Sequence, residues 1–69
     1  MVNTALLELT RKEKGLRMID LAEHLGITLG AYSQKISGKR AFMVKDIIGL
    51  SQILNLGVEE ILLTEKVVK

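Results

Sequence analysis

The sequence contains no cysteine, no proline and no tryptophan, and it has only one tyrosine, one phenylalanine and one histidine. Without cysteine the chain has neither a disulfide framework nor a thiolate metal site. With a single histidine, a metal centre of any kind is not expected. Because aromatic residues are scarce while 48% of the 69 residues are hydrophobic, the core must be aliphatic. We predict that residues 1–69 form one domain, near the lower size limit for a single core.

Long apolar runs are also absent, since no stretch approaches the roughly 20 apolar residues that a membrane span needs. The first residues lack the features of a secretory signal. We therefore expect a cytoplasmic protein without a membrane partner. Groups for catalysis are missing as well: Ser33 has no plausible histidine partner, no two carboxylates suit acid–base chemistry, and no GxxxxGK loop occurs. We expect neither an enzyme nor a bound cofactor.

Apolar residues recur at helical spacing along the chain, which predicts an all-α fold. A first helix begins after Asn3 or Thr4, either of which is a suitable N-cap, and runs to about residue 14. Leu6, Leu7 and Leu9 are expected to form its buried side. A fourth helix is predicted over residues 44–54, where Gly49 indicates close helix packing, and a fifth over residues 58–63. With two helices between them, these segments make a five-helix bundle.

The second and third helices are separated by a short turn. In the second, about residues 17–25, Met18, Leu21, Ala22 and Leu25 lie on one face. Gly26 ends it, Thr28 is a suitable N-cap for a third helix over residues 29–37, and Gly38 closes that helix. Two short helices joined by a turn with a glycine are the helix-turn-helix pattern.

Acidic residues are absent from the middle of the chain, because no Asp or Glu occurs between Glu23 and Asp46. The same stretch carries cations at Lys35, Lys39 and Arg40, followed by Lys45. A DNA duplex carries about one negative charge per 1.7 Å of its axis, so such a surface would attract it. The alternative interpretation is an ordinary solvated stretch without a partner.

The segment DLAEHLGITLGAYSQKISGKR, residues 20–40, resembles the Xre/Cro-C1-type helix-turn-helix family of phage and bacterial repressors. YSQKISGKRAF and LNLGVEEIL further resemble a subgroup common in phages and mobile elements of Gram-positive bacteria. The resemblance implies a compact lambda-repressor-like bundle that binds operator DNA, with the third helix, about residues 28–37, in the major groove. The base-reading positions that it implies are Thr28, Leu29, Gly30, Ser33 and Gln34. The phosphate-binding positions that it implies are Arg17, Lys35, Ser37, Lys39 and Arg40.

The chain departs from the family pattern at several of these positions. Arg17 and Met18 stand where the family has a capping Ser or Thr and a phosphate-binding Gln. Ile36 stands where an acidic partner of Arg11 is usual, so Arg11 either pairs with Glu8 or an acid such as Asp20, or stays in water. Tyr32 is expected in the core and His24 in solvent. Of the base-reading side chains, only that of Gln34 has an amide suited to adenine, which predicts modest sequence specificity.

Two functions remain open from the sequence. The first is a Cro/C1-like transcriptional repressor that acts as a homodimer, with Ile61, Leu62 and Leu63 as its contact. The second is an antirepressor or co-repressor that keeps the fold but mainly binds another repressor protein. The apolar side chains of Leu29 and Ala31 would suit such a protein interface.

Overall fold

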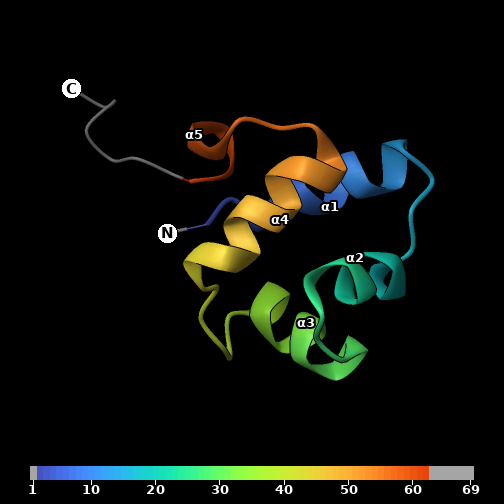
Figure 1. Ribbon diagram of the computed structural model, residues 1–69, viewed down its shortest axis with the longest axis vertical. Helices are drawn as coiled ribbons and strands as arrows, with labels where there is room; N and C mark the ends of the chain where they lie inside the picture. The colour runs from blue at the N-terminus through green and yellow to red at the C-terminus, as the bar shows by residue number, and fades with distance from the viewer. Residues whose placement is uncertain (1, 63–69) are drawn as a thin grey trace.

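The computed structural model describes residues 2–62 and consists of five helices (Figure 1). Their bounds are α1 Thr4–Glu13, α2 Met18–Leu25, α3 Leu29–Ser37, α4 Val44–Leu54 and α5 Val58–Ile61. The only extended pairing in this part of the chain is an isolated antiparallel bridge between Val2 and Leu62. The predicted all-α fold with five helices is therefore confirmed, although α5 ends at Ile61, before residue 63.

Short polar side chains begin α1 and α3. The Asn3 side chain accepts a hydrogen bond from the backbone N–H of Leu6 (3.1 Å), which identifies Asn3 as the N-cap of α1. The Thr28 hydroxyl oxygen accepts from the N–H of Ala31 (3.0 Å) at the start of α3. Gly38 ends α3 with φ of +89°, a conformation that favours glycine. Both predicted ends of α3 are confirmed.

The other three helices begin differently, with an acidic residue in their first turn. The carboxylates of Asp20 in α2, Asp46 in α4 and Glu60 in α5 each accept a hydrogen bond from the backbone N–H three residues earlier. The donor–acceptor distances are 2.7, 2.8 and 2.7 Å. Each carboxylate satisfies a donor that the helix leaves free and places negative charge at the positive end of the helix dipole. At α2 Asp20 thus bonds the backbone N–H of the N-cap residue Arg17, while the Arg17 side chain makes no capping hydrogen bond of the kind a Ser or Thr would supply.

The core is aliphatic around one tyrosine. Its buried side chains are Leu7, Leu21, Ala22, Tyr32, Ile47, Leu50, Leu54 and Ile61. The prediction that Leu9 is buried was wrong, because its side chain is 56% exposed. In α1 only Leu7 and Thr10, three residues apart, are buried, so Leu9 lies on the solvent side of this helix.

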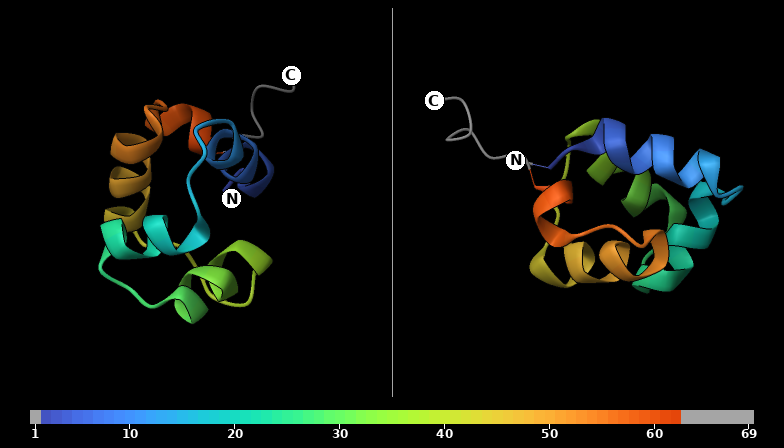
Figure 2. Two further views of the ribbon diagram at one scale, coloured as in Figure 1. Left: turned by 90° about the vertical axis from the view of Figure 1, so that its right-hand side faces the viewer. Right: turned by 90° about the horizontal axis from the view of Figure 1, so that it is seen from above.

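The helices are arranged with α3 at one end of the molecule and α5 at the opposite end (Figures 1 and 2). Between these ends, α2 packs against both α3 and α4, while α1 packs against α4 and α5. The close packing predicted at Gly49 is confirmed, since a Cβ added there would lie 2.6 Å from Cδ2 of Leu25. No helix in residues 2–62 has the length and apolar character of a membrane span.

Candidate nucleic-acid interface

The predicted base-reading residues lie together at the N-terminal part of α3. Residues three and four apart share one face of a helix, so Leu29 and Gly30 lie beside Ser33 and Gln34. These four residues and Thr28 are all exposed. Tyr32 points the other way and is fully buried. The helix therefore anchors itself by its inner face and leaves the outer one free for a ligand.

The loop that follows α3 folds back against the end of this helix. The carbonyl oxygen of Gln34 accepts hydrogen bonds from the N–H groups of Lys39 (2.9 Å) and Arg40 (3.2 Å), and from the Ser37 hydroxyl (3.1 Å). The side chains of Lys39 and Arg40 are exposed. In both Figure 1 and the left view of Figure 2 the loop reaches the same end of the molecule as α3. Two cations and the outer face of α3 thus lie at one end.

Lys35 departs from its predicted role. Its side chain is only 7% exposed, and Nζ lies 2.7 Å from Oδ2 of Asp46 in α4. The same ammonium group donates to the carbonyl oxygen of Ala41 (3.1 Å). Because its charge is buried and paired inside the protein, Lys35 is not accessible to a phosphate, and its predicted role as a phosphate contact was wrong.

The Lys35–Asp46 pair also removes an acid from the surface. Asp46 is 1% exposed and is the only carboxylate between residues 24 and 58. Burial alone raises the pKa of Asp46, but hydrogen bonds from Lys35 and the Met43 N–H and the charges of Lys35 and Lys45 bring it below its usual 3.8. Asp46 therefore stays ionised and paired at neutral pH. The stretch free of exposed acid extends well beyond residue 45.

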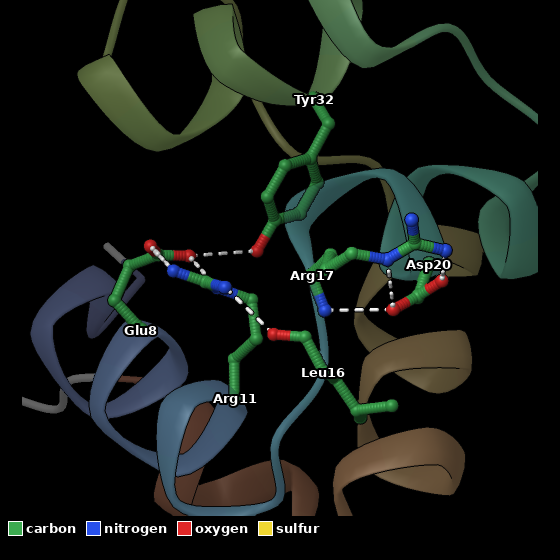
Figure 3. A network of polar contacts seen from close by, with 6 residues as sticks. All are labelled: Glu8, Arg11, Leu16, Arg17, Asp20 and Tyr32. Carbon is green, nitrogen blue, oxygen red and sulfur yellow. Dashed lines mark hydrogen bonds and ion pairs between the residues drawn. The ribbon is translucent and has the colours of Figure 1, made fainter.

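Arg17 is exposed at the start of α2, next to the end that carries α3. Its side chain is 76% exposed, and its guanidinium group pairs with Asp20 (2.9 Å), as Figure 3 shows. Hydrogen bonds from the Arg17 side chain and its backbone N–H lower the pKa of Asp20. Such an exposed pair contributes little to stability. The Arg17 side chain is accessible to a phosphate, but Asp20 competes for it.

A partly buried polar network connects α3 to α1 (Figure 3). Arg11 pairs with Glu8 (2.9 Å) and donates through Nη1 to the carbonyl oxygen of Leu16 (2.7 Å). The Tyr32 hydroxyl donates to Glu8 (3.2 Å). Burial, followed by the negative charge of Glu8, raises the pKa of Tyr32. Of the alternatives for Arg11, pairing with Glu8 is the one observed, and the Tyr32 hydroxyl links this pair to α3.

Of the three residues predicted to form the dimer contact, the structure shows only Leu62 at the surface. Ile61 is fully buried and belongs to the core, so it is not accessible to a second chain, and Leu63 lies outside the described residues. Leu62 is 36% exposed and borders an apolar groove of about 300 Å³. The groove is lined by Val2, Phe42, Met43, Val44, Ile47, Ile48, Val58 and Leu62.

The fold and this surface define a class of protein. Two short helices joined by the turn at residues 26–28, with the second helix exposed beside a basic loop, form a helix-turn-helix. A protein-family model described as helix-turn-helix matches residues 7–61. The chain belongs to this Xre/Cro/C1-type helix-turn-helix family, and it is a DNA-binding regulator that binds double-stranded DNA. Searches of curated proteins and of solved structures found no match.

Proposed function

We propose that the protein is a cytoplasmic transcriptional repressor of the Cro/C1 kind that places α3 in the major groove of an operator. The observation that carries this proposal is the end of the molecule at α3, where the outer helix face adjoins Lys39 and Arg40 and no carboxylate is exposed from residue 24 to residue 58. A regulator that only blocks a promoter needs no more than such a surface.

Gln34 carries most of the proposed base readout. Its amide matches the N6 and N7 edge of adenine, and a bidentate contact of this kind discriminates against other bases by about 1–3 kcal/mol. Ser33 offers a second, adaptable hydrogen bond, and Leu29 suits the methyl group of thymine. Gly30 lets the helix approach the bases, because it is exposed and has no side chain. Thr28 acts mainly as the N-cap.

Lys39, Arg40, Arg17 and Ser37 are the proposed phosphate contacts. Contacts of this kind set affinity and orientation without reading sequence. Lys39 and Arg40 extend from a loop that is hydrogen-bonded to the end of α3, which favours a fixed distance between phosphate and base contacts. Each cation neutralised by a phosphate contributes about 0.9 to the slope of log affinity against log salt.

The apolar groove is the proposed homodimer contact. Met43 and Val44 are 57% and 77% exposed, and they follow directly on the basic loop. A second copy seated there would continue the DNA-binding surface across a twofold axis, as two half-sites one helical turn apart require. Leu62 remains part of this contact, while Ile61 supports it from the core.

Selection from a randomised duplex library near physiological salt tests the proposal. We expect enrichment of a twofold-related motif. With that site, Gln34→Ala should relax preference at one base pair per half-site, whereas Lys39→Ala should weaken all sequences alike and lower the salt slope by about one. Lys12→Ala, at an exposed cation of α1, is the control and should lower the affinity and the salt slope less than Lys39→Ala does. An unaltered preference in Gln34→Ala would remove this residue from the readout.

One observation favours the antirepressor alternative, namely that Leu29 is 44% exposed on the outer face of α3. An apolar side chain there suits a protein partner as well as a thymine. In that case Leu29→Asp should abolish binding to the partner repressor, while the weak, salt-sensitive binding of the basic loop to DNA persists. Loss of selective DNA binding in Leu29→Asp would favour the operator instead.

A further inference from the structure

We infer that the buried Lys35–Asp46 ion pair is a positioning device, which holds the basic loop of residues 38–42 in the orientation that contacts phosphate. This inference rests on the proposed function, because it assigns a role to that loop. Neither residue of the pair touches DNA in this account. Both act through Lys39 and Arg40.

The pair holds the end of the loop that leads into α4. Lys35 lies in the last turn of α3, and its Nζ reaches both Asp46 in α4 and the carbonyl oxygen of Ala41 within the loop. Oδ2 of Asp46 also accepts from the N–H of Met43 (2.8 Å), the residue before α4. One carboxylate oxygen and one ammonium group thus connect the end of α3, the loop and the start of α4.

The end of the loop that follows α3 is held by separate hydrogen bonds. The N–H groups of Lys39 and Arg40 donate to the carbonyl oxygen of Gln34. The two cations therefore lie between an attachment to the backbone of α3 and an attachment to the side chain of Lys35. Phe42, at the end of the loop, also packs against the core, but Lys35 is the side chain that holds the carbonyl oxygen of Ala41, next to Arg40. Without that bond the backbone between Arg40 and Phe42 would be free to reorient, and the directions of Lys39 and Arg40 with it.

The chemistry of the pair argues against a purely stabilising role. Lys35 is 7% and Asp46 1% exposed, so both charges have lost most of their hydration. Oδ1 of Asp46 is buried without a hydrogen-bond partner. Replacing a buried ion pair by apolar side chains is often neutral or stabilising. An ion pair with one unsatisfied oxygen is thus not expected to be more stable than an apolar contact. Its directional bonds do, however, fix the relative positions of α3, the loop and α4, which an apolar contact would not.

The test uses the double variant Lys35→Met/Asp46→Asn. It leaves the net charge unchanged, and an asparagine oxygen can still accept from the N–H of Met43. The bridge from Lys35 is lost, together with the negative charge of Asp46 at the start of α4. The matched control is Lys12→Met/Glu13→Gln, which removes one cation and one acid from exposed positions of α1. Where the first variant does not fold, Lys35→Met/Asp46→Leu takes its place.

Two measurements are made on folded protein. Amide hydrogen exchange should become about tenfold faster at Lys39 and Arg40, with the amides of α2 unchanged. Affinity for a 20-base-pair duplex of mixed sequence, titrated at several salt concentrations, should fall about tenfold, with a salt slope lower by about one to two. The control should match the wild type in both.

The result that overturns the inference is a folded double variant with wild-type exchange in the loop, or with wild-type affinity and salt slope. Failure of the proposed function looks different, because the wild-type chain itself would then bind no duplex and Lys39→Ala would have no effect. Exchange in the loop would in that case decide by itself whether the pair holds the loop in place.

Discussion

Replacing Arg11 by methionine tests the network that connects α3 to α1. The guanidinium group of Arg11, with a side chain 11% exposed, makes two hydrogen bonds to Glu8 and one to the carbonyl oxygen of Leu16. Methionine keeps most of the apolar stem but none of these bonds. Glu8 would retain only the Tyr32 hydroxyl as a partner, and the carbonyl oxygen of Leu16 would have to find water.

The expected cost follows from partial burial. Breaking a fully buried ion pair costs about 3–5 kcal/mol, whereas exposed pairs contribute about 0–1 kcal/mol. Glu8 is 23% exposed and can regain some hydration, so we expect Arg11→Met to lower the free energy of unfolding by about 2–3 kcal/mol. A domain of this length has about 3–10 kcal/mol in total. The change is thus a large part of the stability.

Urea unfolding followed by far-ultraviolet circular dichroism measures this loss, because the chain has no tryptophan. The matched control is Lys12→Met, at an exposed neighbour on α1, which should change stability by less than about 0.5 kcal/mol. In the folded variant, the ring resonances of Tyr32, the only tyrosine, should shift as its hydroxyl contact changes. A loss below about 0.5 kcal/mol for Arg11→Met, with the Tyr32 resonances unmoved, would refute the reasoning.

Further predictions concern other acids and two glycines. Asp20→Asn should raise affinity for mixed-sequence duplex a few-fold, measured by fluorescence anisotropy, because Arg17 becomes free for a phosphate and a negative charge disappears; unchanged affinity would place Arg17 away from the DNA. The pKa of Asp46 lies below its usual 3.8 in the folded protein. The contribution of this carboxylate to the free energy of unfolding should therefore be fully present at neutral pH and be lost as the pH falls below about 4. Lys35→Met/Asp46→Asn should show a shallower acid loss in thermal unfolding, and an identical profile would contradict this assignment. Gly30→Ala should stabilise by up to about 1 kcal/mol. Gly49→Ala should give a free energy of unfolding about 1–3 kcal/mol lower than that of Gly30→Ala, because its Cβ would lie 2.6 Å from Cδ2 of Leu25. Equal melting temperatures of the two variants would show that the Leu25 side chain moves aside without cost.

The sequence predicts best what is encoded locally. The bounds of α3 follow from Thr28 and Gly38, a hydroxyl that caps the first turn and a glycine that adopts a positive φ. Tyr32 could be placed in the core because it is the only aromatic residue of this helix. Signals of this kind depend on neighbours within four residues, so one chain segment is enough to recognise them.

Contacts between distant segments were missed. Lys35 looks like a surface cation until Asp46, eleven residues later in another helix, is placed beside it. An acid three residues inside a predicted helix start could have indicated the role of Asp46 as a backbone acceptor, but not its second partner. The burial of Ile61 and the exposure of Leu9 depend on how α1 and α5 turn against α4. Helical spacing alone does not determine this when a helix has apolar residues on several sides.

The most direct test of the central proposal, that α3 and its loop form the DNA surface, is amide chemical-shift mapping of the labelled protein with its selected duplex. We predict that the large shifts fall on residues 28–34 and 38–40, with a further shift at Arg17. The amides of α5, at the opposite end of the molecule (Figure 1), should stay within the spread of the control residues of α1. Large shifts confined to α5 and the apolar groove, with α3 unaffected, would contradict the account.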